Sequence, residues 1–188
     1  FVSISFEQDN LFVILPEMQF DYAVLFFDNL HISKKVEKLL RKNDYEFKVH
    51  ENYEKIIDKI NEYHGDSWIV KEYKQTLLNL KNYKGNIDFE LLACSIEDKN
   101  TKKIIAGEIG YKVGTVYTSL SGFSSKERRF NNYGKLQLVL LAKYLEESGF
   151  SFWNLGHPYM KYKFVLGATL YKREDFLNIF REQRDKKI

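Results

Sequence analysis

Few side chains in this chain of 188 residues have the types and spacing of a catalytic set. The single cysteine, Cys94, lies in an apolar segment with strand character, whereas a reactive thiolate needs an electropositive, partly open site. We therefore expect a buried structural cysteine. The histidines lack the spacing of metal ligands, so no metal site is expected. The carboxylates, Glu108 among them, form no obvious acid/base pair, and either face of the sheet is open to Glu108.

Phosphate-binding features are limited to one loop and two basic clusters. No glycine-rich loop of the Walker type is present, but the segment from Arg129 to Gly134 precedes an expected helix, whose first amides suit a phosphate. The net charge of +3 is too mild for a protein coated with nucleic acid. The basic residues nevertheless gather in two places: Lys34, Lys35, Lys38, Arg41, Lys42 and Lys48, and Lys126, Arg128 and Arg129. Phosphate binding and an ordinary solvated surface both remain open for them.

The elements that must position these groups follow from hydrophobic periodicity. Strands are expected at 11–15, 22–27, 89–97, 104–113, 115–120 and 150–155. Helices are expected from Ser33 to Arg41, from Asn52 to Gly65, from Trp68 to Gly85, and at 135–148 and 173–183, with Ser33 and Asn52 as N-caps.

The order of the elements from Ile104 to Ala168 is strand, turn, strand, loop, helix and strand, which predicts an α+β fold of the acetyltransferase type. In such a fold a ligand enters between splayed strands of a mixed sheet. We expect a small N-terminal α/β subdomain with the basic helix at residues 1–86, and the acetyltransferase-like domain at 87–188. No apolar run is long enough to cross a bilayer, so we expect no membrane association and a cytoplasmic location.

Several short motifs occur in the order found in leucyl/phenylalanyl-tRNA–protein transferases. They are Leu30-His31-Ile32-Ser33, Ser67-Trp68-Ile69, Ala106-Gly107-Glu108-Ile109-Gly110-Tyr111, Ser121-Gly122-Phe123-Ser124, Lys135, Leu166-Gly167-Ala168 and Arg173-x-Asp175-Phe176-Leu177. The resemblance covers roughly Ala23 to Phe180. It implies an enzyme that transfers an amino acid from charged tRNA to the N-terminal amine of a protein, which marks that protein for degradation, and it implies no cofactor.

This chain departs from the family pattern at four places. Leu120 replaces the glutamate before Ser-Met-Phe-Ser, and Leu77 replaces a helix tyrosine. Leu155-Gly156-His157 stands where the family has Asp-x-Gln, and the upstream Trp-Trp segment is not recognisable.

A second, local resemblance occurs at the same place. Leu155-Gly156, followed by Met160-Lys161-Tyr162-Lys163, is similar to a pattern of arginyl-tRNA–protein transferases, which share the fold and act on acidic N-termini. Loss of carboxylates and gain of Lys161 and Lys163 would favour an Asp or Glu acceptor over an Arg or Lys acceptor.

The resemblances suggest a role for each candidate residue. His157 would either accept the proton of the attacking amine or stabilise the oxyanion. Asn154 and the strand amides near Leu120 and Ser121 are the other candidates for the oxyanion. Trp68 would stack on the terminal adenine, and Glu108 is the candidate carboxylate for an arginyl donor. The other donor-site candidates are Leu77, Leu120, Ser121, Phe123 and Ser124. Lys161 and Lys163 are the acceptor-site candidates. The candidates for tRNA phosphates are Lys34, Lys35, Lys38, Arg41, Lys42, Arg129 and Lys135.

Two other functions remain open. One is a coenzyme-A-dependent N-acetyltransferase, although the loop before the 135–148 helix has only one glycine. The other is a non-catalytic module that keeps the fold and has lost the activity.

Overall fold

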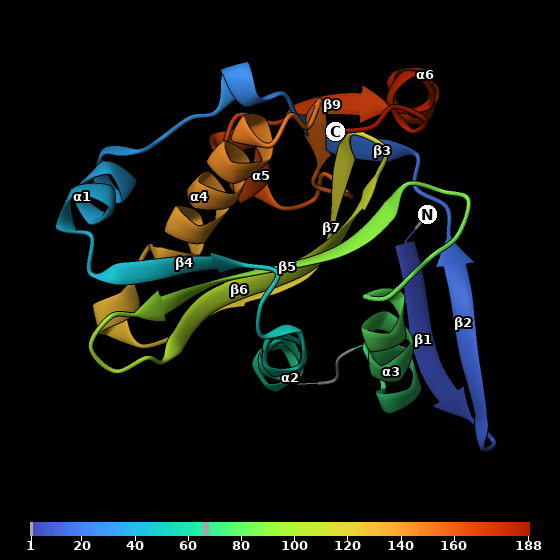
Figure 1. Cartoon of the computed structure of the whole chain (residues 1–188), viewed down its shortest axis with the longest axis horizontal. Helices are drawn as coiled ribbons and strands as arrows, with labels where there is room; N and C mark the ends of the chain where they lie inside the picture. The colour runs from blue at the N-terminus through green and yellow to red at the C-terminus, as the bar shows by residue number, and fades with distance from the viewer. Residues whose placement is uncertain (1, 66–67) are drawn as a thin grey trace.

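The computed structural model describes residues 2–65 and 68–188, so Ser67 of the tryptophan motif lies outside the described residues. In chain order, the elements are β1 (Val2–Gln8), β2 (Leu11–Glu17), β3 (Asp21–Leu25), η1 (Phe27–Asn29), α1 (Lys34–Lys42), β4 (Tyr45–Val49), α2 (Tyr53–His64), α3 (Lys71–Leu80), β5 (Phe89–Asp98), β6 (Ile104–Val113), β7 (Val116–Ser124), η2 (Arg128–Phe130), α4 (Tyr133–Glu147), β8 (Phe152–Asn154), α5 (Lys161–Val165), β9 (Thr169–Lys172) and α6 (Arg173–Gln183). Figure 1 shows their arrangement.

Seven strands form one mixed sheet in the order β4-β5-β6-β7-β8-β3-β9, and β1 pairs with β2 in a separate hairpin. β7 and β8 run parallel, while every other described pairing is antiparallel. The predicted mixed sheet of the acetyltransferase type is confirmed. No described helix has both the length and the apolar character needed to span a membrane.

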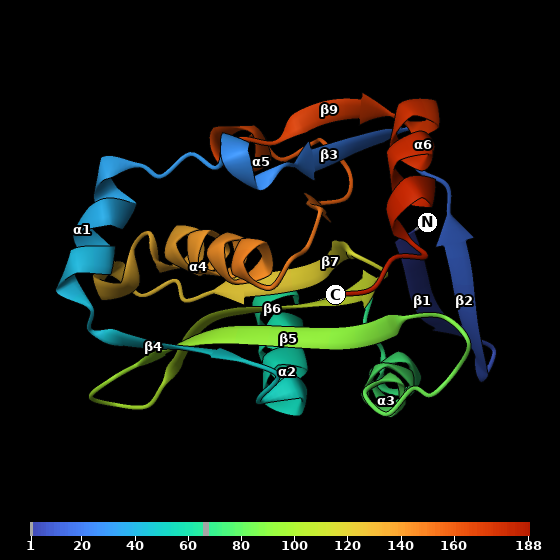
Figure 2. The same ribbon diagram turned by 45° about the horizontal axis from the view of Figure 1, so that its top comes forward.

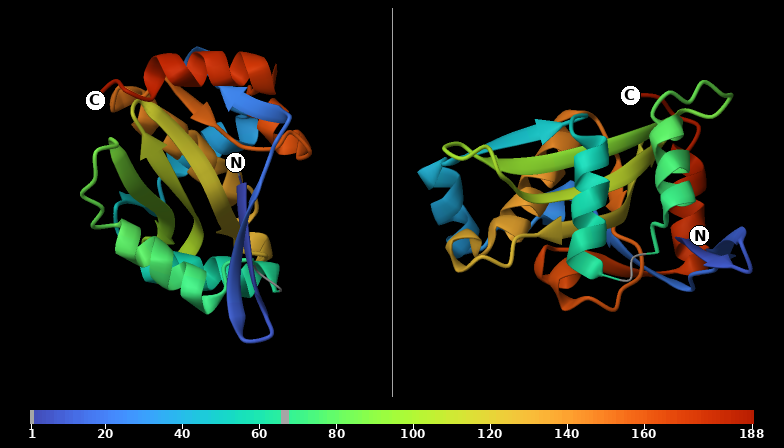
Figure 3. Two further views of the ribbon diagram at one scale, coloured as in Figure 1. Left: turned by 90° about the vertical axis from the view of Figure 1, so that its right-hand side faces the viewer. Right: turned by 90° about the horizontal axis from the view of Figure 1, so that it is seen from below.

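Helices cover both faces of the sheet, because β5 is apolar on both sides. Leu92, Cys94 and Ile96 pack with α4, whereas Leu91 and Ala93 pack with α2 and α3. Figure 1 shows α4 on one side of the sheet and α2 and α3 on the other. α6 covers the end of the sheet formed by β3 and β8, where it packs with Tyr22, Val24 and Phe152. Figure 3 shows the curved sheet with α3 and α6 at opposite ends of its open side.

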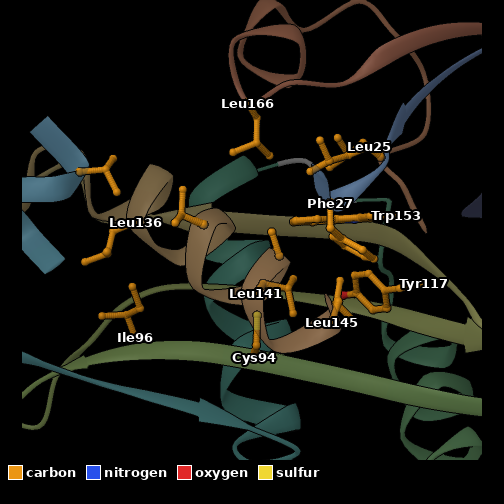
Figure 4. Packing of buried hydrophobic residues seen from close by; sticks show 14 of the residues in the cluster. Leu25, Phe27, Cys94, Ile96, Tyr117, Leu136, Leu141, Leu145, Trp153 and Leu166 are labelled. Atoms are coloured by element: carbon orange, nitrogen blue, oxygen red, sulfur yellow. The ribbon is translucent and has the colours of Figure 1, made fainter. Parts of the chain in front are cut away.

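The largest buried cluster lies between α4 and the sheet (Figure 4). Trp153, Tyr117 and Leu141 are fully buried in it. Cys94 is also buried there, as expected, and its Sγ accepts a hydrogen bond of 3.1 Å from Gln137 Nε2. Burial raises the pKa of Cys94 well above its ordinary value, so the thiol stays protonated.

Two predicted helix caps are wrong in detail. Ser33 and Asn52 occupy the N-cap positions of α1 and α2, but neither side chain makes a capping hydrogen bond. Asn52 adopts a left-handed backbone with a φ of 59°, and its Nδ2 donates to Glu97 Oε1 at 3.0 Å. The amide is therefore used to tie α2 to β5. Gly65 ends α2 as predicted, whereas α3 ends at Leu80, before the predicted stop at Gly85.

The segment between α3 and β5 contains the expected subdomain boundary near residue 86. β3 and β4 precede this boundary, yet they lie in the same sheet as β5–β9. The division at residue 86 therefore stays a prediction about folding units and does not separate two sheets.

Candidate functional site

The parallel strands β7 and β8 separate shortly after they meet. β8 pairs with β7 from Val116 to Thr118. β8 is also paired with β3, and beyond Asn154 the chain continues along β3 alone. There Leu155 N donates to Ala23 O at 2.9 Å, and Ala23 N donates to Gly156 O at 2.8 Å. β7 continues to Ser124 on the other side, so an opening forms where the two strands diverge.

A β-bulge in β7 lies at the start of this opening. The register with β6 shifts so that Ile109 faces Ser121 and Gly110 faces Ser119, which leaves Leu120 as the extra residue. Glycine is required at 110, because a Cβ there would lie 2.3 Å from Tyr117 Oη and 2.5 Å from Thr118 O. The bulge therefore depends on a position that accepts no side chain.

A cavity of about 1030 Å³ occupies the opening and extends between α3 and α6. Eleven of the residues predicted to form the site line it: Glu108, Asn154, His157, Trp68, Leu77, Leu120, Ser121, Phe123, Ser124, Lys135 and Lys163. Residues that are far apart in the sequence thus meet around one space. Their predicted roles stay predictions.

One part of the lining, here called the polar wall, consists of Glu108, Ser119, Gln137, Asn154 and Lys163. Its centre is Glu108, which is buried and points to the α4 side of the sheet.

The carboxylate of Glu108 accepts hydrogen bonds from three neighbours. They are Tyr117 Oη (3.0 Å) and Ser119 Oγ (2.8 Å) on Oε1, and Gln137 Nε2 (3.3 Å) on Oε2. On balance the pKa of Glu108 is raised from its ordinary value, because burial outweighs the three donors and the charge of Lys163, which lower it. The three donated hydrogen bonds stabilise the ionised form against this effect of burial.

Lys163 comes from α5 and is also buried. Its Nζ donates to Leu155 O and His157 O, both at 2.6 Å, so it holds the chain that leaves β8. Burial lowers the pKa of Lys163 to about 8. The ammonium form therefore still predominates at pH 7.

Asn154 and His157 lie beside this lysine. Asn154 Oδ1 accepts from Gly156 N at 2.9 Å, and its Nδ2 donates to Thr118 Oγ1 at 3.3 Å. The ring of half-buried His157 stacks on Tyr159, with centroids 5.1 Å apart. The loop after β8 is thus fixed by side-chain contacts at both of the predicted catalytic positions.

Another part of the lining, here called the apolar wall, consists of Trp68, Tyr73, Leu77, Leu91 and Phe123. Trp68 is half-buried, and its ring lies 5.4 Å from that of Tyr73. The hairpin supports this wall, because Ser5 Oγ donates to Trp68 O and Phe12 packs on the same cluster. Leu77 is buried, whereas Phe123 is half-buried. These residues leave an aromatic and aliphatic surface toward the cavity.

The other predicted site residues lie outside the cavity. Lys161 is exposed on α5, and Arg129 is exposed on η2 with its Nε 2.8 Å from Glu127 Oε2. The five basic residues of α1 are exposed, and Lys42 Nζ lies 2.5 Å from Asp44 Oδ2. Figure 2 shows α1 at the end of the molecule away from α3 and α6, which border the cavity.

Sequence reasoning missed two members of the polar wall. Gln137 lies on the inward side of α4 next to Leu136, and a buried amide in an apolar stripe is a signal of a polar network. Ser119 bridges Glu108 and Trp153, whose Nε1 donates to Ser119 Oγ at 2.8 Å. No sequence signal pointed to Ser119, because the bulge places it.

Comparisons with known proteins show the family to which this chain is similar. A sequence model of the family described as Leucyl/phenylalanyl-tRNA protein transferase matches residues 24–181. Proteins named Leucyl/phenylalanyl-tRNA–protein transferase are similar to this chain. The protein from Shewanella halifaxensis is 28% identical over 171 residues, covering 88% of this chain and 66% of the relative. The protein from Pseudomonas putida is 26% identical over 167 residues, covering 87% and 69%.

This chain thus spans about two thirds of the length of these curated relatives. Among solved structures, the C-terminal DUF2156 domain of a protein from Agrobacterium fabrum superposes with a TM-score of 0.50 and 12% identity. The match covers 73% of this chain and 46% of that chain, and it supports the fold alone. On the family match over residues 24–181, this chain belongs to the leucyl/phenylalanyl-tRNA protein transferase family.

Proposed function

We propose that this chain transfers an amino acid from aminoacyl-tRNA to the N-terminal amine of a protein. The observation that carries the proposal is the cavity between the splayed strands, which lies inside the segment matched by the family. The relatives are named for a leucyl or phenylalanyl donor, and the apolar wall suits such side chains.

The reaction needs no covalent enzyme intermediate. The nitrogen of the acceptor amine attacks the carbonyl carbon of the ester that joins the amino acid to the ribose of the terminal adenosine. A C–N bond forms, the C–O bond to the ribose breaks, and the amine proton goes to the ribose oxygen. An ester is an activated acyl group, so most of the acceleration comes from holding the two reactants together.

The residues around the cavity suit four tasks in this reaction. Trp68 stacks on the terminal adenine, as an exposed aromatic face does with any base. Leu77, Leu120 and Phe123 surround the donor side chain, with Ser121 and Ser124 beside them. The second N–H of Asn154 Nδ2 and the amides of β7 near Leu120 stabilise the oxyanion. His157 receives the amine proton and passes it on.

Substituting His157 with alanine tests its role as a proton acceptor. We expect a reduction of about 100-fold or more in single-turnover transfer, the usual contribution of a general base. Unchanged transfer by the alanine variant would remove His157 from the mechanism.

The acceptor is proposed to carry an acidic N-terminus, because Lys161 and Lys163 make α5 positively charged and attract a negative group through their field, without a direct contact to Lys163. An arginyl donor is the alternative to a leucyl or phenylalanyl donor. Transfer adds a new N-terminal residue, which we propose marks the protein for degradation. A reaction that consumes charged tRNA also supports the cytoplasmic location proposed for this chain.

A grid of donors and acceptors tests the proposed function. Purified protein is incubated with Leu-, Phe- or Arg-tRNA and with peptides that begin with Asp, Glu, Arg or Lys, and the products are identified by mass. The account predicts extension of the acidic peptides by leucine or phenylalanine. An N-acetylated copy of each peptide is the control and should stay unmodified. No extension in any combination would contradict the proposal, and transfer of acetyl from acetyl-CoA would favour the rival enzyme.

A further inference from the structure

Two opposite charges are buried in the lining of the same cavity. Glu108 is 4% exposed and Lys163 is 3% exposed, and both border the space between the splayed strands. Burying a carboxylate and an ammonium costs several kcal/mol per ion unless good partners compensate. Both groups also hold the surrounding chain through hydrogen bonds, but each borders a space that a ligand can enter, and a ligand that pairs with them would offset the cost of burial.

The two charged groups do not neutralise each other through a direct contact. Among the described residues, no ion pair within 4.0 Å joins Glu108 to Lys163 or to any other cation. The hydrogen-bond partners of Glu108 are the neutral side chains of Tyr117, Ser119 and Gln137. The partners of Lys163 are the main-chain carbonyls of Leu155 and His157.

Each charged group keeps hydrogen-bonding capacity. Oε1 of Glu108 accepts two bonds, but within residues 2–65 and 68–188 Oε2 accepts only the longer one from Gln137. An ammonium carries three N–H groups, and the Nζ of Lys163 uses two. Because both residues line the cavity, one acceptor position on Glu108 and one donor position on Lys163 remain for a ligand that enters it. A ligand with a positive group and an oxygen acceptor on neighbouring atoms complements both.

An aminoacyl ester has this pair of groups, whatever its side chain. On the proposed function, on which this inference rests, such an ester enters the cavity. We propose that Glu108 binds the α-ammonium group of the donated amino acid and that Lys163 binds its ester carbonyl oxygen. The polar wall then recognises the main-chain atoms of the donor, and the apolar wall recognises its side chain. A donor with a blocked amine is rejected.

The geometry argues against the other use of Glu108, as a partner for the guanidinium of an arginyl donor. A paired guanidinium fork needs both carboxylate oxygens, and Oε1 already accepts two hydrogen bonds.

Binding of two stable analogues tests the proposal on the wild-type protein. The probes are 3′-deoxy-3′-(leucylamino)adenosine, whose amide cannot be transferred, and its N-acetylated form, with affinity measured by calorimetry. We expect the free amine to bind about 10- to 100-fold more tightly, the value of one hydrogen-bonded charge. Equal binding of the two probes overturns this inference. Failure of both probes to bind contradicts the proposed function itself.

Two variants then assign the selectivity to its residues. Glu108→Gln should abolish the preference for the free amine, while Glu147→Gln, an exposed change on α4, should leave it intact. Lys163→Met should lower the affinity for both leucyl probes by a similar factor, because both probes keep the carbonyl oxygen. An arginyl probe provides the competing outcome: if Glu108→Gln weakens only that probe, Glu108 binds the donor side chain and the proposal is wrong. Thermal unfolding of each variant checks that it is folded.

Discussion

The polar wall and the apolar wall line one cavity, but they are held in place by different forces. The polar wall draws on β6, β7, β8, α4 and α5, and hydrogen bonds fix nearly every side chain in it. The apolar wall draws mainly on α3 and the sheet, and packing fixes it. Hydrogen bonds impose defined directions, whereas packing tolerates changes of shape. The polar wall is therefore suited to constant main-chain groups, and the apolar wall to a choice among side chains.

The largest loss of stability is expected from a change at Gly110, because the bulge in β7 starts the opening that both walls line. Gly110→Val would place a side chain against Tyr117 and Thr118 and destroy the bulge that starts the opening. We expect a loss of about 4 kcal/mol or more of unfolding free energy, the range of severe core overpacking and strain. Urea unfolding measures it, and Gly65→Asn, in open space at a φ of 70°, is the control. Equal stability of Gly110→Val and wild type would show that the bulge is dispensable.

Removal of the aromatic ring from the apolar wall should lower the affinity for the donor analogue. It should not change the preference for a free amine over an N-acetylated amine. For Trp68→Ala we expect binding of the leucyl probe to fall about 10- to 100-fold, since base–aromatic stacking contributes about 1–3 kcal/mol. Tyr83→Ala, a half-exposed ring outside the cavity lining, is the matched control. Were Trp68→Ala to remove the preference for a free amine, the two walls would not act separately.

The buried Lys163 of the polar wall should make the unfolding free energy depend on pH. Lys163 has a pKa of about 8 in the folded chain and about 10.5 unfolded, so the unfolded state binds more protons between these values. Stability contributed by Lys163 therefore rises with pH through this window. From pH 8 to pH 10 the wild type should gain about 2 kcal/mol relative to Lys163→Met. Urea unfolding at pH 8 and pH 10 measures this change. If the unfolding free energies of the two proteins differed by the same amount at both pH values, a buried ammonium would be contradicted.

The smallest effect is expected from the surface, far from both walls. If Lys34, Lys35 and Lys38 contact tRNA phosphates, tRNA binding should depend less on salt when all three are changed to Gln. The slope of the logarithm of the binding constant against the logarithm of the salt concentration should decrease in magnitude by about 2. Lys84, Lys186 and Lys187 are also exposed, and the same triple change there is the control. An unchanged slope for the first triple variant would assign α1 to the ordinary solvated surface.

The elements with strong periodicity were predictable from the sequence. The bounds of β6 and α6 match the prediction, because ten and eleven residues, respectively, keep one clear pattern. β4 and β9 were missed, and both are short edge strands, of five and four residues. In β4 the charged Glu46 and Lys48 alternate with apolar residues, a strand pattern that the prediction overlooked. α5 has only five residues, too few for a helical period.

The candidate site was predictable only in part. Glu108 and Lys163 were both identified as candidates, but their meeting in one cavity depends on how α5 packs, which no local pattern encodes. Gly167 illustrates this, because its φ of 112° and a Cβ position 1.9 Å from Asn29 O fix the turn after α5. The motif Leu166-Gly167-Ala168 was visible, whereas its contact with the segment after β3 was not.

A crystal structure with 3′-deoxy-3′-(leucylamino)adenosine tests the central claim most directly, because it locates all parts of the donor at once. The account predicts the adenine against Trp68, the leucyl side chain on the apolar wall, and the α-amine within hydrogen-bonding distance of Glu108. An analogue bound elsewhere on the molecule, with the cavity between β7 and β8 unoccupied, would contradict it.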